Sequence, residues 1–128
     1  NVSKDLTIEA LIAVENFFKG KHFNSEIYGL SLESYLEYIQ VSSNNNFSSL
    51  IISQISDAVE QVNQLDSDYV FQINSNNTPM LYAYDAIQLL VVSFKVDMLQ
   101  ALSVSVDAAV KAASVAYLSP VAVSALFA

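Results

Sequence analysis

Glycine and proline are nearly absent from this chain, and that scarcity limits its fold more than any other feature. The 128 residues contain two of each, and neither type occurs between Pro79 and Pro120. Tight turns between strands often need these residues, so the scarcity favours helices over a β fold with many turns. One helix between the two prolines would be about 60 Å long, too long for a small globular domain. We therefore expect a break near Ser103 or Ser105, either of which can cap a new helix.

The composition is typical of one folded domain with its own core. Hydrophobic residues make up 53% of the chain and charged residues 14%, unlike a disordered tail. A chain of 128 residues usually forms one domain, which we place over residues 1–128. There is no cysteine, so disulfides and thiolate metal sites are excluded. We expect an all-α fold, a compact bundle of five or six helices.

Capping residues and apolar spacing place these helices along the chain. In the third helix, Ile51, Ile55 and Val62 recur at helical spacing and predict the core face, whereas Gln54 is expected on the opposite, solvent face. Leu30 and Tyr35 are placed to form a hydrophobic staple around the cap Ser31. The expected elements are a helix from Asp5 or Thr7 to Gly20, a loop over 21–30, a short helix over 32–39, a polar linker over 42–46, a helix over 47–65, a short extended segment over 69–73, a long helix opened by Thr78 and Pro79, and a last turn from Ser119 to Phe127.

The charge is strongly negative and contains no arginine. Thirteen acidic residues face five lysines, and the net charge is −8. Nucleic-acid binding depends on cationic contacts with phosphate, with arginine as the main bidentate donor, so we expect no nucleic-acid partner. The most apolar stretch, Met80 to Val96, is interrupted by Asp85 and Gln88. It is therefore read as a core helix, and no membrane span is expected.

The supply of catalytic groups is small. His22 is the single histidine, and no G-x-S-x-G pattern accompanies it. Zinc would need several Cys or His ligands, and the calcium-binding EF-hand pattern is absent. Gly20 and Gly29 are too few for a phosphate-binding loop. We therefore expect a protein that is not an enzyme, with no catalytic residue, no metal site and no cofactor.

Three residues are candidates for a response to pH. His22 can change charge near neutral pH. Glu33 and Glu37 lie four residues apart on one expected helix, where like charges repel each other by a few tenths of a kcal/mol. The alternative for the two glutamates is an exposed acidic face.

Charged residues in the long helix are candidates for burial. Asp85, Lys95 and Asp97 interrupt an otherwise apolar sequence. Each of them, if buried, would need a partner to offset a desolvation cost of several kcal/mol. A helix that is apolar on more than one face needs cover on more than one side, either from its own bundle or from a second copy of the chain.

Three segments resemble one known family. Phe47 to Ser56 (FSSLIISQIS), Ala86 to Ser93 (AIQLLVVS) and Leu99 to Ser105 (LQALSVS) look like the helical non-repetitive domains of spider silk proteins, the carboxy-terminal type most of all. The resemblance implies a helical bundle that keeps stored silk protein soluble and drives its assembly through dimers and through changes in pH and salt. The chain departs from the family in lacking its interchain cysteine and all arginine, and in having Val91 and Val92 where an acidic residue is expected.

Two functions are consistent with these features. The first is a secreted structural or assembly domain that associates with itself, or with other structural chains, through the apolar helix faces of residues 79–118. The sequons at Asn1, Asn46 and Asn76 fit secretion, and acid or salt would relax the repulsion between acidic copies. The alternative is a secreted carrier of a small apolar ligand, with a pocket lined by some of the seven tyrosines and seven phenylalanines.

Overall fold

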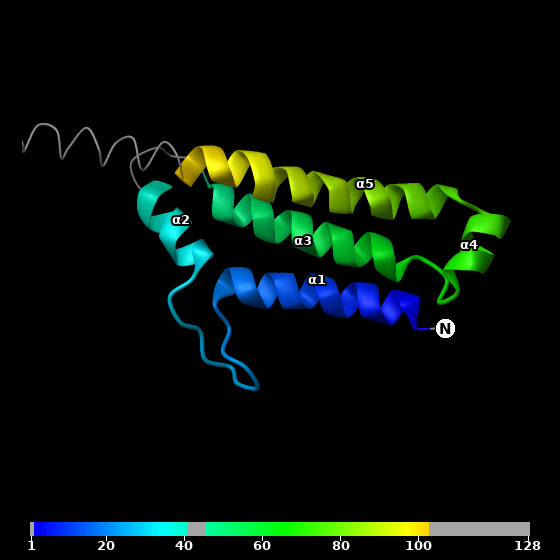
Figure 1. The fold of residues 1–128 in the computed structure, drawn as a ribbon, viewed down its shortest axis with the longest axis horizontal. Coiled ribbons are helices and arrows are strands. Elements are labelled where there is room, and N and C mark those ends of the chain that lie inside the picture. The colour runs from blue at the N-terminus through cyan, green and yellow to red at the C-terminus, as the bar shows by residue number, and fades with distance from the viewer. Residues whose placement is uncertain (1, 41–45, 103–128) are drawn as a thin grey trace, which may run out of the picture.

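Five α-helices make up the described part of the chain, which is residues 2–40 and 46–102 of a computed structural model (Figure 1). No strand occurs within these residues, so the expected all-α bundle is confirmed. The expected break near Ser103 or Ser105 and the last turn from Ser119 lie outside the described residues. The helices are α1 (Ser3–Lys19), α2 (Leu32–Gln40), α3 (Phe47–Asn63), α4 (Tyr69–Ser75) and α5 (Thr78–Val92), and a π-helical segment η1 (Ser93–Asp97) continues α5.

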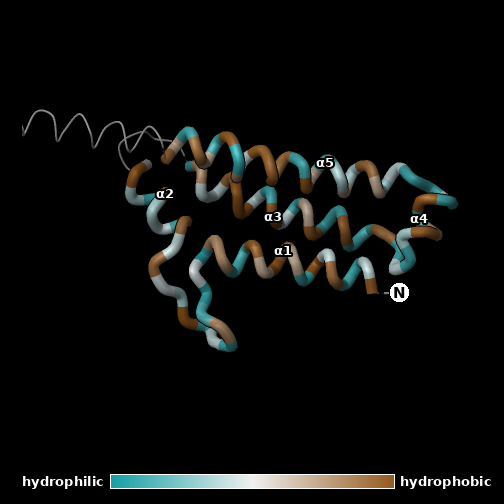
Figure 2. The backbone as a smooth tube through the Cα atoms, viewed as in Figure 1, coloured by the Kyte–Doolittle hydropathy of each residue, from teal (hydrophilic) through white to brown (hydrophobic). Residues whose placement is uncertain are grey.

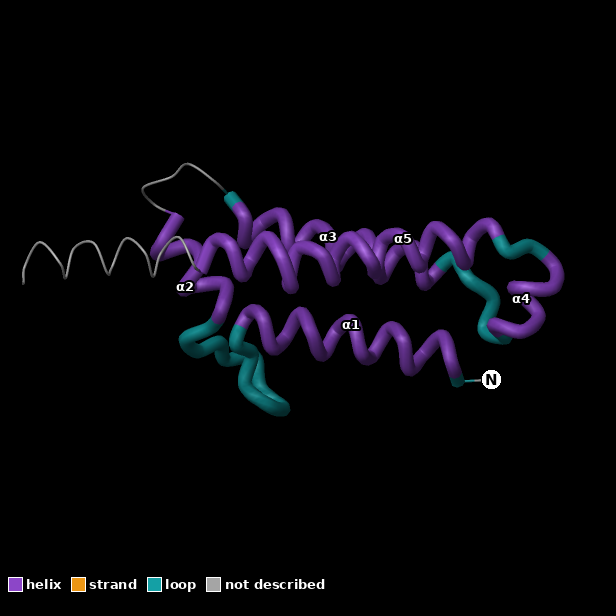
Figure 3. Tube along the Cα trace, turned by 45° about the horizontal axis from the view of Figure 1, so that its top comes forward, coloured by secondary structure: helices purple, strands orange, loops and turns teal. Residues whose placement is uncertain are grey.

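The long helices α1, α3 and α5 lie lengthwise beside one another, with α3 between the other two in the view of Figure 1. Successive long helices run in opposite directions, and the short α2 and α4 sit at the two ends of α3 (Figures 1 and 3). Because α3 contacts both α1 and α5, it is covered on two sides and carries the largest share of the core.

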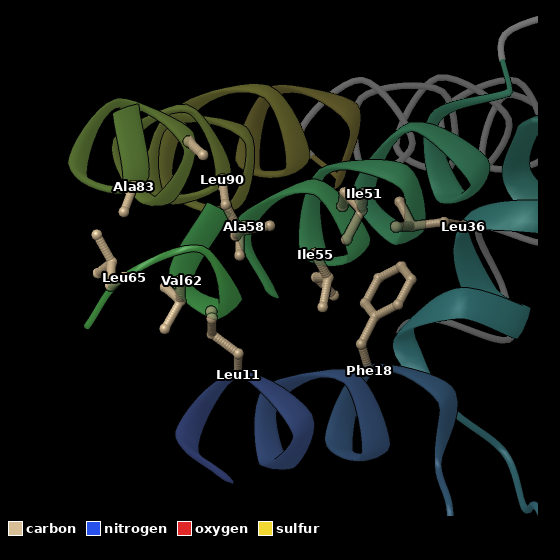
Figure 4. Close-up of a cluster of buried hydrophobic side chains, with 11 residues drawn as sticks. Leu11, Phe18, Leu36, Ile51, Ile55, Ala58, Val62, Leu65, Ala83 and Leu90 are labelled. Carbon is tan, nitrogen blue, oxygen red and sulfur yellow. The ribbon is translucent and has the colours of Figure 1, made fainter. Parts of the chain in front are cut away.

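The core is a continuous apolar cluster that follows α3 (Figure 4). Ile51, Ile55 and Val62 of α3 are fully buried, as the spacing of these residues predicts. Phe18 of α1 points toward α3 in Figure 4, and its ring also meets Phe94 edge to face, with the ring centroids 5.8 Å apart and the planes at 87°. The remaining members are Leu11 of α1, Leu36 of α2, Ala58 of α3, Leu65 after α3, and Ala83, Ala86 and Leu90 of α5.

Gln54 is buried, which contradicts the expected solvent-facing position. Its exposed fraction is 8%, and its Oε1 atom has no hydrogen-bond partner among the described residues. The sequence pattern assigns one apolar stripe to α3, but a helix packed on two neighbours buries a wider arc than one stripe. The amide therefore lies in the core because α3 is the central helix.

The ends of α1 and α2 follow the predicted capping signals in part. Gly20 ends α1 in the left-handed conformation, at φ 71°, and an added Cβ there would lie 2.8 Å from Ser31 Cβ. Ser31 caps α2, since its Oγ accepts a hydrogen bond from the Ser34 amide at 3.1 Å, and Ser34 Oγ accepts one from the Ser31 amide at 2.9 Å. The predicted staple is wrong, because Leu30 is fully exposed. Helix α1 also begins at Ser3, earlier than predicted.

The expected extended segment at 69–73 is instead the helix α4. Asp68 caps it, with Oδ1 accepting hydrogen bonds from the amides of Val70 and Phe71 at 2.9 and 3.3 Å. The buried Gln72 then ties both flanking loops to the helix: its Oε1 accepts from the Asp66 amide at 2.8 Å, and its Nε2 donates to the Asn76 carbonyl at 2.6 Å. These local bonds outweigh the alternating pattern of apolar residues.

Candidate interaction surface

The three candidate pH-responsive residues lie near the junction of α1 and α2, and no hydrogen bond or ion pair joins them within residues 2–40. His22 is exposed, and its main-chain amide donates to the Ile27 carbonyl at 2.9 Å. Its ring lies against Gly29, where an added Cβ would be 2.8 Å from Nε2. Glu33 is half-buried and Glu37 is exposed. The structure therefore places these groups on the surface, in no shared site.

Lys19 lies among acidic groups at this junction. Its Nζ donates to Glu15 Oε1 at 2.6 Å, and this hydrogen bond is the main reason that the pKa of Lys19 is raised. Partial burial acts in the opposite direction, and the negative charges of Glu15 and Glu33 raise the pKa further. The positive charge of Lys19 therefore lies near Glu33, one of the two glutamates, Glu33 and Glu37, that are predicted to repel each other. The sequence did not indicate this charge.

Asp85, Lys95 and Asp97, the candidates for burial, are all exposed in this structure. Asp85 lies on the side of α5 opposite the buried Ala83 and Ala86. For Asp97 the cause is the π-helical segment. With 3.6 residues per turn, the position seven residues after the buried Leu90 would face the core. The wider turn of η1 takes up one extra residue, so Met98 packs against the core and Asp97 faces solvent.

Helix α5 and its continuation are apolar on two faces, and the other described residues leave one of them uncovered. Figure 2 shows hydrophobic residues along the whole length of this helix. The inner face packs on α3, while aliphatic side chains between 46% and 59% exposed line the opposite side. We define the α5 outer face as these aliphatic residues with the two charged residues among them: Leu81, Asp85, Leu89, Val92, Lys95, Val96 and Leu99. Exposed apolar surface of this extent is typical of an interaction site.

A second apolar surface lies on the loop between α1 and α2, which projects from the bundle in Figure 1. Phe23 is 92% exposed, and Ile27, Tyr28 and Leu30 are also exposed. The loop is ordered by its own hydrogen bonds: the Gly29 amide donates to the Gly20 carbonyl at 2.9 Å, and the Ile27 amide donates to Ser25 Oγ at 2.9 Å. The sequence predicted only a loop here, although its four apolar side chains between Phe23 and Leu30 could have indicated an apolar surface.

Among residues 2–40 and 46–102, no group of three or more His, Asp or Glu side chains is arranged to hold a metal ion. None of the helices in that part of the chain is both long and apolar enough to cross a membrane. Asn46 and Asn76 are exposed, and the Oδ1 atom of each accepts a main-chain hydrogen bond, from Ser49 and Thr78 respectively.

Comparison with models of known protein families, with curated proteins and with solved structures finds no match to this chain. The α5 outer face is therefore interpreted from its own chemistry.

Proposed function

We propose that this chain is a non-enzymatic structural or assembly domain that associates with itself through the α5 outer face. The observation that carries the proposal is the row of half-exposed aliphatic side chains along one rigid helix. The resemblance of three segments of the chain to the non-repetitive domains of spider silk proteins supports the same role, in a secreted protein. Self-association gives the second apolar face of α5 the cover that its sequence requires.

The size of this face indicates a conditional association. Burying the exposed half of one such aliphatic side chain contributes on the order of 1 kcal/mol. Five residues on each of two copies then contribute roughly 10 kcal/mol, which is comparable with the cost of about 4 to 15 kcal/mol for joining two molecules. The balance is close enough for the repulsion between two copies of net charge −8 to decide it.

Salt and acid are the two conditions that weaken this repulsion. Raising the salt concentration shortens the Debye length from about 30 Å at 0.01 M to about 10 Å at 0.1 M, so it screens charges that are not in direct contact. Acid protonates carboxylates and histidine and makes each copy less negative. His22, Glu33 and Glu37 act in this scheme through the total charge of the chain, since they lie outside the α5 outer face.

Molar mass measured by light scattering behind a sizing column, at pH 7.5 and 5.5 and in low and high salt, tests the proposal. We expect a mass near the 14.0 kDa of one chain at neutral pH in low salt, and a shift toward twice that mass in high salt or acid. A dimer under every condition would agree with the assembly role but contradict its dependence on salt and pH. A single-chain mass at every concentration and condition would overturn the proposal and favour the carrier of an apolar ligand.

A further inference from the structure

We infer that the partner of the α5 outer face is the same face of a second copy, running antiparallel about a two-fold axis at the level of Leu90. This inference rests on the proposed self-association and adds its geometry. It starts from two pairs of exposed residues on α5 and η1 that lie at equal sequence distances on either side of Leu90. Leu81 lies nine residues before Leu90 and Leu99 lies nine after it, and both are exposed.

The charged residues follow the same symmetry with opposite signs. Asp85 lies five residues before Leu90 and Lys95 lies five after it, and both are exposed. In an antiparallel pair centred on Leu90, Asp85 of each copy comes to the level of Lys95 in the other copy. The pair then has two such levels of opposite charge, with Leu81 and Leu99 meeting at its two ends. Opposite charges across a helix pair favour one orientation over its alternatives.

The alternative arrangements bring like charges together. In a parallel pair, each Asp85 meets the second Asp85, and each Lys95 meets the second Lys95. A slip of the antiparallel pair to a centre at Val91 brings Asp85 to the level of Asp97, which is also exposed. Like charges at an interface are unfavourable, so the charges favour the antiparallel pair centred on Leu90 over both of these arrangements.

Charge exchange tests the orientation. In the antiparallel pair, Asp85→Lys and Lys95→Asp each create like-charge levels, and we expect each to weaken dimerisation about three- to tenfold, by the scale of exposed charge pairs. The double variant restores the opposite charges, and we expect its dissociation constant within about twofold of the original chain. The control is Asp57→Lys, which makes the same charge change on an exposed position of α3. It reduces the negative charge without touching the face, and we expect it to leave association equal or stronger.

Disulfide trapping gives a second, independent readout, because the chain has no cysteine of its own. In the antiparallel pair the two copies of residue 81 lie roughly 27 Å apart along the helices, beyond the reach of a disulfide, which needs Cα atoms within about 7 Å. We expect Leu81→Cys alone and Leu99→Cys alone to give no crosslink, and an equimolar mixture of the two to give the mixed dimer.

Each remaining outcome overturns a stated part of the inference. A dimer that crosslinks through Leu81→Cys alone, and whose charge variants show no rescue, is parallel and contradicts the orientation while leaving self-association intact. A dimer in which neither the charge variants nor the cysteine pairs have an effect uses another surface. A chain that stays monomeric contradicts the proposed function itself.

Discussion

At the scale of single residues, the clearest conflict between sequence pattern and structure is Gln54. Its amide lies in the core of α3 with Oε1 unpaired, and an unpaired buried polar atom costs about 1 to 3 kcal/mol. Sequence spacing could predict that Ile51, Ile55 and Val62 are buried, because these residues repeat at helical intervals. It could not predict Gln54, because spacing within one helix does not tell how many neighbours pack around it.

Replacing Gln54 with leucine is expected to raise the free energy of unfolding by about 1 kcal/mol, because it removes the unpaired oxygen and adds apolar contact. Urea unfolding followed by circular dichroism, at a concentration where the chain is monomeric, measures the change. Gln64→Leu is the control, since Gln64 is exposed at the end of α3, and it should change stability by less than about 0.5 kcal/mol. A loss of stability in Gln54→Leu would show that the amide has a partner in the folded protein.

At the scale of elements, the sequence predicted those helices whose ends carry strong local signals. Gly20 marks the end of α1, and Ser31 marks the start of α2. Helix α4 was missed because the alternation of Tyr69, Phe71 and Ile73 imitates a strand, although Asp68 offered a cap at its start. The π-helical turn at Ser93–Asp97 was not predictable from periodicity, because it changes the period that such reasoning assumes.

One aromatic contact joins α1 to η1. The rings of Phe18 and Phe94 meet edge to face at 5.8 Å. A double-mutant cycle with Phe18→Leu and Phe94→Leu should give a coupling energy of about 0.5 to 1.5 kcal/mol by urea unfolding. The control is a double-mutant cycle with Phe18→Leu and Phe71→Leu. Phe71 is exposed on α4, so the coupling energy of this cycle should be near zero. Equal coupling in the two cycles would contradict a specific role for this contact.

At the scale of the whole molecule, the proposed self-association depends on net charge and on the α5 outer face. The pKa values of Lys19 and Lys21 are raised above 10.5, mainly by hydrogen bonds to Glu15 and Glu26. A raised lysine pKa contributes stability that is complete below the unfolded value and is lost only as pH rises through the folded value. Both lysines therefore stay charged between pH 5.5 and 7.5 and do not contribute to a change of association in that window.

The sequence predicted that the long helix needs cover on two sides, and the structure shows which side is open. The sequence left open whether Asp85, Lys95 and Asp97 are buried, since composition alone does not tell which face of a doubly apolar helix meets the bundle, and all three are exposed. The symmetry of Asp85 and Lys95 about Leu90 bears on an interface only because both side chains are exposed on the α5 outer face. The sequence alone does not show that they are exposed.

The dissociation constant of Leu89→Gln, measured by sedimentation equilibrium beside that of Leu50→Gln, tests whether the α5 outer face is the contact between two copies of the chain. Both leucines are about half exposed, Leu89 on the α5 outer face and Leu50 on α3. If the outer face is the contact between copies, Leu89→Gln removes apolar area from both sides of the interface and weakens dimerisation at least about tenfold, equivalent to about 1.4 kcal/mol. Leu50→Gln should leave the constant unchanged. Equal constants for the two variants, or a larger effect at Leu50, would contradict self-association through α5.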